Sequence, residues 1–527
     1  MAGGCPASAF GEAQAAFDRG SGVRVLTFFA RLLVPLLIVA GLIADSGLER
    51  AVPEASEIQV FDTESSISGS SALTSTWYCP TAHSRELAES GIDAEVDLLV
   101  TNTSAEPTRV TVYLVSPTSP LKSIYLEVPG LASRSLPIAE YTDDELVSAL
   151  VEAPSSGVAV TRSIRSPYGL DAALCSSLVA DEWYVLSADT QADASGHLII
   201  YNPLPTDAVI DLTFASEAEV GSYAPSELTG IVIPAASSLS IRLDDNVRRR
   251  QLLTAVVKAR FGRVVVDHLQ TFNGSSGRVG FSATLASATR STSWHHPALR
   301  LEKDERVALV LFNPTEFVAE TELQISSGEG KVKSVFASVG PFDLTGINIL
   351  PLEDEELATN TLFVSPGNFG ITVKSLNGVP IVSAAELGAG PVGSPGQESD
   401  DSELLEPQEE SEKVELPKGR VSGLSILNGT PEGSGTWMLA APNLGGQMLI
   451  SVLNTSGRGE DVYLSQFGDR ANYRVNVPGN AVRQLFVGTG GTWEIKSEVP
   501  IVVAALHQKA LAAGLMSIAP VKFGVEE

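Results

Sequence analysis

The sequence predicts an all-β protein, in which tandem β-sandwich (immunoglobulin-like) repeats stand behind one N-terminal transmembrane helix. Three observations lead to this prediction. One apolar segment lies near the N-terminus, similar Trp-led segments recur along the rest of the chain, and short strands separated by Pro, Gly, Asn and Ser fill each recurrence. Closure of the repeats in the manner of a β-propeller is the alternative architecture.

The apolar segment at residues 25–44 is long enough for one helical crossing of a membrane. Arg31 lies near its start, where the side chain can reach the interface, and Arg19 and Arg24 precede it. The positive-inside rule then predicts a single-pass signal anchor in the cell membrane, with residues 1–24 in the cytoplasm and the bulk of the chain extracellular. A cleaved signal peptide is the alternative, and it also exports the chain.

Export changes what the cysteines can do. Cys79 and Cys175 are the two cysteines on the exported side, where an oxidising environment allows them to form a disulfide. Such a bond would close a long loop and contribute about 3–5 kcal/mol on the chain-entropy model. Two buried free thiols are the alternative.

Internal repetition is the strongest signal beyond the anchor. Four Trp residues open similar segments, the first three at intervals of about 110 residues, and an acidic insert lengthens the last interval. From Glu398 to Glu415 acidic residues stand against Lys413 alone, which predicts an extended linker. The predicted organisation is residues 1–24, cytoplasmic N-terminus; 25–44, anchor; 45–76, Ser/Thr/Glu-rich spacer; 77–182, repeat 1; 183–293, repeat 2; 294–387, repeat 3; 388–417, acidic disordered linker; 418–527, repeat 4.

Each repeat follows one internal pattern. An apolar strand ends in Asn, which suits a strand end because its side chain can bond the local backbone. A turn such as Val128-Pro129-Gly130 follows, and two closing strands complete the unit. The opening residues, Trp77, Trp183, Trp294 and Trp437, are predicted to fill the sandwich cores. A sugar-stacking platform is the alternative for these Trp residues, and it would favour exposed aromatic clusters.

This pattern resembles repeats in actinobacterial exported proteins. The Trp77-Tyr78-Cys79-Pro80 start after one N-terminal span looks like a family of membrane-anchored extracellular proteins of unknown function from that group, over roughly Val25 to the C-terminus. The resemblance implies a location in the cell envelope and no catalytic residues. Repeat 3 departs from the pattern at its turn, where Val339-Gly340-Pro341 replaces the Pro-Gly order.

Composition limits the functions that remain. With 35 Lys and Arg against 63 Asp and Glu, the net charge is −28, which excludes a general nucleic-acid binder because such proteins need a basic surface. The basic run Arg248–Arg250 is predicted to balance Asp244 and Asp245, and an anion site there is the alternative. No Gly-x-Ser-x-Gly elbow is present, and we expect neither an enzyme nor a cofactor.

Few residues suggest a metal site. His295 and His296 are neighbours on a predicted strand and point to opposite faces, which disfavours chelation. His268 and His507 are interpreted as strand surface residues. Acidic clusters before the penultimate strands, at Asp143–Glu145, Asp244–Asp245 and Glu353–Glu356, are predicted to be short helical turns capped by Thr142 and Asp244; loop-bound calcium is the alternative.

The sequence therefore predicts a non-catalytic membrane-anchored cell-envelope protein, a scaffold of extracellular repeats for protein–protein interaction. A binding module for cell-wall or exported polysaccharide is the alternative. That alternative requires exposed aromatic side chains along one groove, for which Tyr113, Tyr125, Tyr184 and Tyr201 are the candidates.

Overall fold

The computed structural model describes residues 65–67, 73–84, 94–275, 278–301, 305–330, 332–351, 360–389, 423–442, 447–468, 471–488, 490–508, 515–518 and 521–523. These residues belong to one compact unit, Asp62–Glu527, and strands dominate it, so the predicted all-β class is confirmed. Within the described part of the chain, no helix is long and apolar enough to cross a membrane. The predicted anchor at 25–44 and the N-terminus at 1–24 lie outside the described residues.

Repeat 1 consists of two antiparallel four-stranded sheets, ordered β2-β7-β4-β5 and β6-β3-β8-β9. Both sheets contribute buried side chains to one apolar cluster, which includes Trp77, Leu98 and Val112. A short 3-10 turn, η1 (Ile138–Glu140), follows β6. The strands are β2 (Ser75–Ser84), β3 (Glu95–Asn102), β4 (Thr108–Val115), β5 (Lys122–Val128), β6 (Ala132–Pro137), β7 (Leu146–Ala153), β8 (Val158–Ser166) and β9 (Gly169–Leu174).

Repeat 2 has the same plan. Its sheets are ordered β10-β16-β12-β13, with β14 also beside β12, and β15-β11-β17-β18, and most of its core lies in one cluster around Trp183 and Phe214. The elements are β10 (Glu182–Ala188), β11 (Ala194–Asn202), β12 (Ala208–Ser216), β13 (Glu219–Tyr223), η2 (Ser226–Leu228), β14 (Thr229–Ile233), β15 (Ser237–Arg242), α2 (Leu243–Asn246), β16 (Leu253–Phe261), β17 (Val265–Asn273) and β18 (Val279–Leu285).

Repeat 3 is completed by a strand that lies beyond the acidic segment. Its sheets are ordered β19-β25-β21-β22 and β24-β23-β20-β26-β27. The predicted boundaries place β27 in repeat 4, but β27 pairs with β26 of repeat 3. β26 itself extends to Ala389, two residues into the predicted linker. Apart from residues 388 and 389, that linker lies outside the described residues. The strands are β19 (Ser293–Leu301), β20 (Glu305–Phe312), β21 (Ala319–Ser326), β22 (Val332–Val339), β23 (Leu344–Pro351), β24 (Thr361–Val364), β25 (Gly367–Ser375), β26 (Val382–Ala389) and β27 (Gly423–Asn428).

In repeat 4 one long strand belongs to both layers. The first half of β33 pairs with β28 and β30, and its second half pairs with β29 and β34. In repeat 1 two separate strands, β7 in one sheet and β8 in the other, take the place of this single long strand. The strands are β28 (Ser434–Ala441), β29 (Gln447–Asn454), β30 (Glu460–Gln466), β31 (Asn472–Val477), β32 (Val482–Val487), β33 (Gly491–Gln508), β34 (Leu515–Ile518) and β35 (Val521–Phe523).

The strand order within a repeat differs from that of an immunoglobulin domain. There the first two strands are neighbours in one sheet. Here β2 and β3, the first two strands of repeat 1, lie in different sheets, and β2 pairs with β7 instead. The repeats therefore share a two-sheet plan with immunoglobulin domains but not their connectivity.

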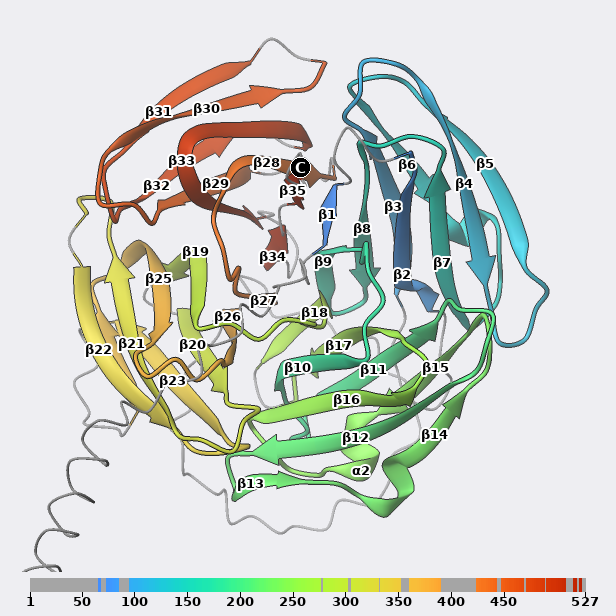
Figure 1. Cartoon of the computed structure of the whole chain (residues 1–527), viewed down its shortest axis with the longest axis horizontal. Helices are drawn as coiled ribbons and strands as arrows, with labels where there is room; N and C mark the ends of the chain where they lie inside the picture. Colours follow the sequence, from blue (N-terminus) through green and yellow to red (C-terminus); the bar gives the residue numbers. More distant parts are fainter. Residues whose placement is uncertain are drawn as a thin grey trace, which may run out of the picture. The chain divides into compact units, whose positions relative to one another are not determined.

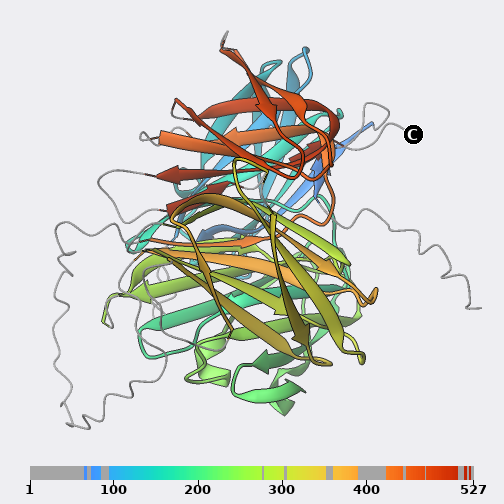
Figure 2. The ribbon, with the colours of Figure 1, turned by 90° about the vertical axis from the view of Figure 1, so that its left-hand side faces the viewer.

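The four repeats follow one another around a common centre (Figure 1). Figure 2 shows repeat 3, in yellow, between the green strands of repeat 2 and the red strands of repeat 4. Repeat 4 also meets repeat 1: β1 (Ser66–Ile67) pairs with β35, Ile67 is buried in the repeat 1 cluster, and Ser133 Oγ lies 2.6 Å from Thr492 Oγ1. β1 falls in the segment we expected to be a spacer. From the sequence we expected contact between the first and last repeats only in a β-propeller, whose blades are single sheets. Here repeats 1 and 4 meet although each repeat has two layers of strands.

The opening Trp of every repeat is buried and makes the same long-range hydrogen bond. Each indole Nε1 donates to a backbone carbonyl at the start or in the middle of a closing strand, over 2.7 or 2.8 Å, and each side chain is about 1% exposed. The acceptors are Val158, Val264, Ile381 and Ile501. The residues therefore occupy core positions, as predicted, and exposed sugar-stacking platforms at these positions are excluded.

The strand-terminal Asn of every repeat is a second shared feature. In repeat 2, Asn202 Nδ2 donates to the carbonyls of Thr206, Ile233 and Pro234, while Oδ1 accepts from Leu204 N. Asn102, Asn313 and Asn454 hold the equivalent loop and turn. Repeat 3 keeps this arrangement although its turn sequence departs from the pattern.

We expect Asn202→Asp to lower the free energy of unfolding by about 2–3 kcal/mol, because a buried carboxylate would face three carbonyl oxygens and donate to none. Urea denaturation at neutral pH measures this loss. Asn273→Asp, at an exposed side chain whose Oδ1 accepts from Ser275 N as a carboxylate also can, is the matched control and should change stability by less than about 0.5 kcal/mol. Equal effects of the two substitutions would contradict the assigned role.

Candidate functional site

A disulfide joins Cys79 to Cys175, as predicted, with the two Cα atoms 4.6 Å apart. Both residues are fully buried in the core of repeat 1. The bond lies beside a two-way backbone bridge, in which Tyr78 and Ser176 each donate to the other's carbonyl. It therefore connects the first strand of repeat 1 to the residues that lead into repeat 2.

A buried ion pair connects repeats 1 and 2. Arg162 of β8 and Asp267 of β17 are both almost completely buried, and their side chains are bonded to each other through two atoms of each group. Arg162 also donates to the carbonyls of Thr81 and Leu174, and Asp267 accepts from Thr81 N. The pair joins one positive and one negative group. A second buried carboxyl at this junction, Asp171 of β9, accepts from Ser282 Oγ and Ala283 N of β18.

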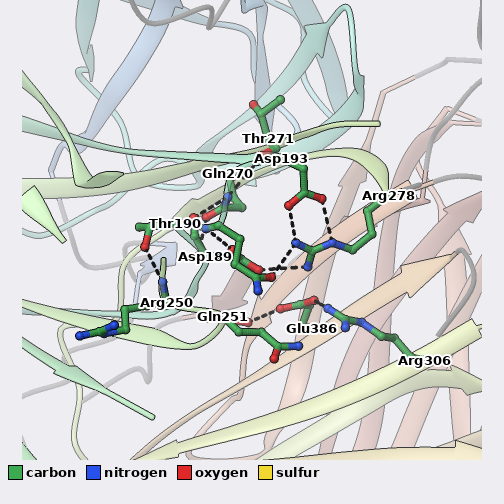
Figure 3. Close-up of polar contacts among 12 residues, drawn as sticks. Asp189, Thr190, Asp193, Arg250, Gln251, Gln270, Thr271, Arg278, Arg306 and Glu386 are labelled. Carbon is green, nitrogen blue, oxygen red and sulfur yellow. Dashed lines mark hydrogen bonds and ion pairs between the residues drawn. The ribbon is translucent and has the colours of Figure 1, made fainter. Parts of the chain in front are cut away.

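A larger charged cluster connects repeats 2 and 3 (Figure 3). Arg278, just before β18, donates to Asp189, Asp193 and Gln191 at 3.0–3.1 Å. In repeat 3, Glu386 of β26 accepts from Arg306 and from Ser187 of repeat 2, each at 2.5 Å. We call these side chains the repeat 2–3 cluster.

The repeat 2–3 cluster contains three carboxyl groups and two guanidinium groups, so its members cannot all be charged and balanced. Burial raises the pKa of Asp189 to about 7, although Arg278 opposes this effect. Burial works in the same direction on Glu386, but Arg306 and Ser187 together lower the pKa of that carboxyl. Asp189 is therefore more easily protonated than Glu386. Each charged group of the cluster has a partner within its own repeat, and the hydrogen bond from Ser187 to Glu386 links repeat 2 to repeat 3.

The histidines are more deeply buried than the sequence indicated. His295 Nδ1 lies 3.0 Å from Thr372 Oγ1 and His296 Nε2 lies 2.8 Å from Ser383 Oγ, so the two rings point to opposite faces, as expected. The prediction that His268 and His507 are surface residues is wrong, because both are at most 2% exposed. Both faces of their strands are covered, one by the repeat's own core and the other by neighbouring strands.

The acidic clusters differ from their predicted form. Asp244 and Asp245 lie in the first turn of α2, but the N-cap is Arg242, and Asp244 pairs with Arg242 rather than with the Arg248–Arg250 run. Asp143 and Asp144 lie in a turn, where Asp144 N donates to Thr142 Oγ1. Glu353–Glu356 lie outside the described residues. Among the residues described, no three His, Cys, Asp or Glu side chains are placed to hold one metal ion.

The four tyrosines proposed for a polysaccharide groove do not form one. Tyr184 and Tyr201 are about 1% exposed, so the expectation that they are surface residues is wrong. Tyr125 is exposed on β5 and pairs with Thr111 of the adjacent strand β4. Tyr113 lies on β4, two residues after Thr111. These two residues mark the outer surface of one sheet rather than the wall of a groove.

One end of repeat 3 exposes a group of large apolar side chains. Phe317, Val318, Phe342 and Leu376 are 64, 43, 43 and 56% exposed. Their three loops are bonded together: Phe342 N donates to Thr315 O, Asn377 Nδ2 to Val318 O, and Asn313 Nδ2 to Phe317 O. We call these four residues the repeat 3 apolar end.

The apolar residue at the Phe317 position is particular to repeat 3, whereas the Phe342 position is also apolar and 45% exposed in repeat 1, where it is Leu131. The strand-terminal Asn defines the equivalent loop position in each repeat, because its amide bonds the carbonyl four residues later. That position is Glu106, Thr206, Phe317 and Arg458 in the four repeats, and all four are exposed. Sequence reasoning missed this difference, although aligning the loops on Asn would have revealed it.

Phe342 is also held in an unfavourable backbone conformation. Its φ is +52°, and the equivalent turn residues Leu131, Ala236 and Asn480 have φ between +47° and +55°. Side chains other than Gly, Asn and Asp are uncommon in this left-handed region. Repeats 1 and 3 thus place a large exposed apolar residue, Leu131 or Phe342, where repeat 4 has Asn480.

The buried histidines predict how stability changes with pH. Burial lowers the pKa of His197, His268 and His295 to about 4 and that of His296 to about 3, from 6.5. Between pH 4 and 6.5 the unfolded chain binds more protons than the folded one at these sites, so the free energy of unfolding rises with pH. Asp189 has a raised pKa, so between about pH 4 and 7 it makes the free energy of unfolding fall as pH rises. This single group is outweighed by the four histidines.

We therefore expect stability to increase from pH 4.5 to 6.5 and to level off near pH 7, as measured by urea denaturation at several pH values. In His268→Gln the increase should be smaller, because one of the four buried groups that resist protonation is gone. A profile that is flat or falls with pH over this range would contradict the assignment.

Comparison with known proteins gives one family match. Residues 152–398 match the model of a family described as "Family of unknown function (DUF5719)". The match runs from the end of β7 in repeat 1 to the start of the acidic segment, and it supports an uncharacterised family, which is coarser than the group the sequence resembled. No curated protein matches the chain.

Among solved structures, one match is titled "Crystal structure of tetra-tandem repeat in extending region of large adhesion protein". It is 11% identical, and the alignment covers 87% of this chain and 99% of that one, with a TM-score of 0.09. A score this low carries no argument about the fold.

Proposed function

We propose that this chain is a non-catalytic cell-envelope protein, anchored in the membrane by residues 25–44, whose extracellular β-sandwich repeats bind a protein partner. The observation that carries the proposal is the repeat 3 apolar end. The disulfide in repeat 1 supports export, because such bonds persist in oxidising compartments.

The first step of the argument is energetic. Covering a Phe side chain contributes roughly 1.5–3 kcal/mol, so leaving Phe317 and Phe342 exposed forgoes stability that a partner could recover. Exposed apolar patches with polar surroundings are typical of interaction sites. The neighbouring Glu316 and Glu320 provide a polar border.

The second step concerns the class of partner. Aromatic and aliphatic side chains together form the centres of protein interfaces. A polysaccharide site would instead combine aromatic rings with polar groups that bond to hydroxyls, and Val318 and Leu376 offer none. The repeat 3 apolar end therefore fits a protein better than a glycan.

A photo-crosslinking amino acid placed at Phe317 in the full chain, in its own envelope, tests this proposal. We expect a discrete adduct that protease removes and that glycan-degrading enzymes leave intact. The same substitution at Thr206, the equivalent exposed loop position of repeat 2, is the matched control and should give no adduct. An adduct sensitive only to glycan digestion, or equal labelling at both positions, would overturn the proposal.

Phe342→Asn separates binding from stability. Asn tolerates positive φ, so we expect the free energy of unfolding to rise by about 0.5–1 kcal/mol, while the adduct formed from position 317 decreases. Asn480→Phe, the reciprocal change in repeat 4, should lower stability by a similar amount and leave the adduct unchanged. A loss of stability in Phe342→Asn would show that the aromatic side chain serves the fold.

A further inference from the structure

A cavity of about 150 Å³ lies where the four repeats meet. The last strands of the repeats surround this region: β9 is bonded to β18 through Asp171, and β18 is bonded to β27 through Ser282. β34 lies beside both β27 and β9. Every repeat contributes to the described lining, with Ala172 from repeat 1, Trp183 from repeat 2, Trp294 from repeat 3 and Trp437 from repeat 4.

The walls are mainly apolar. Beside the three Trp residues, alanines line the cavity from several strands, among them Ala283 of β18, Ala298 of β19 and Ala504 of β33. Small side chains leave space at a position where four sheets converge, and larger apolar residues would have filled it. The cavity therefore depends on the small side chains at these positions, and the arrangement of the repeats does not by itself require it.

Several polar side chains in the lining are bonded to the protein. Thr284 Oγ1 donates to Ile426 O at 2.9 Å, Asn428 Nδ2 donates to Leu285 O at 2.7 Å, and His296 pairs with Ser383. Lys522 Nζ lies 5.8 Å from the centre of the Trp437 ring, a cation–π distance. Water needs two to four polar partners to occupy a cavity, and these walls favour an apolar occupant instead.

We propose that this cavity binds a small uncharged apolar molecule, either one aromatic ring or a hydrocarbon of equal size. A volume of about 150 Å³ is enough for a single benzene ring, which sets the size of the ligand. Because the walls come from all four repeats, an occupant contacts all of them and stabilises their closed arrangement. The site is separate from the repeat 3 apolar end, so either proposal can fail without the other.

Bromobenzene tests the site, because its heavy atom quenches tryptophan fluorescence and three Trp residues line the cavity. Titration of the purified full chain should give saturable quenching, and toluene should raise Tm as its concentration increases. Ala283→Leu should weaken binding by about tenfold or more, because the larger side chain occupies the space of the ring.

Ala288→Leu, at a half-buried lining position after β18, is a second variant should Ala283→Leu not fold. Ala224→Leu adds the same three carbons at an exposed position outside the lining and should bind as the unmodified chain does. Quenching that increases linearly with concentration and is equal in all variants, or a Tm that toluene does not raise, would overturn the proposal.

Discussion

The hydrogen bond from each opening Trp to a closing strand is the interaction on which the rest of the structure depends. It joins residues that are 81, 81, 87 and 64 positions apart in the four repeats, so it forms only when the first and last parts of a repeat have come together. A buried indole N–H needs an acceptor, and one carbonyl in each repeat provides it. The bond fixes the first strand against the closing strand, and the closing strand in turn positions the last strand at the centre.

Four similar repeats must also be joined in the right order, and the buried charges suit this task. The pair at the first junction is balanced, with Arg162 against Asp267, whereas the repeat 2–3 cluster combines three carboxyl groups with two guanidinium groups. Buried ion pairs contribute little net stability compared with apolar packing, but a mismatched neighbour at the first junction would leave Arg162 or Asp267 unpaired at several kcal/mol. The ion pairs of the repeat 2–3 cluster each lie within one repeat, and the hydrogen bond from Ser187 to Glu386 crosses between the repeats. The polar contacts that cross the two junctions therefore differ.

Features that repeat or depend on a local pattern could be predicted from the sequence: the all-β class, the recurring Trp and Asn, and the Cys79–Cys175 bond. Features that depend on distant pairing could not. Nothing local shows that β27 returns to β26 across the acidic segment, and alternation cannot show that His268 is covered on both sides. The junction charges carry little local signal, because Arg162 lies in a strand that also contains Thr161, Ser163 and Arg165, and its partner lies 105 residues away. The exposed end of repeat 3 becomes visible only when the loops are compared.

The four repeats share buried contacts but differ in the side chains that they expose. The hydrogen bonds of the strand-terminal Asn account for this combination. The strand-terminal Asn fixes the path of the following loop by bonding its backbone, so it does not restrict the side chain there. The same scaffold then presents an acid, a hydroxyl, an aromatic ring and a guanidinium at Glu106, Thr206, Phe317 and Arg458. Phe342, in a left-handed conformation that Asn480 adopts at lower cost, adds a second exposed ring beside Phe317 in that one repeat. Phe317 differs from the polar residues at the three equivalent loop positions, and folding alone gives no reason for an exposed aromatic ring there.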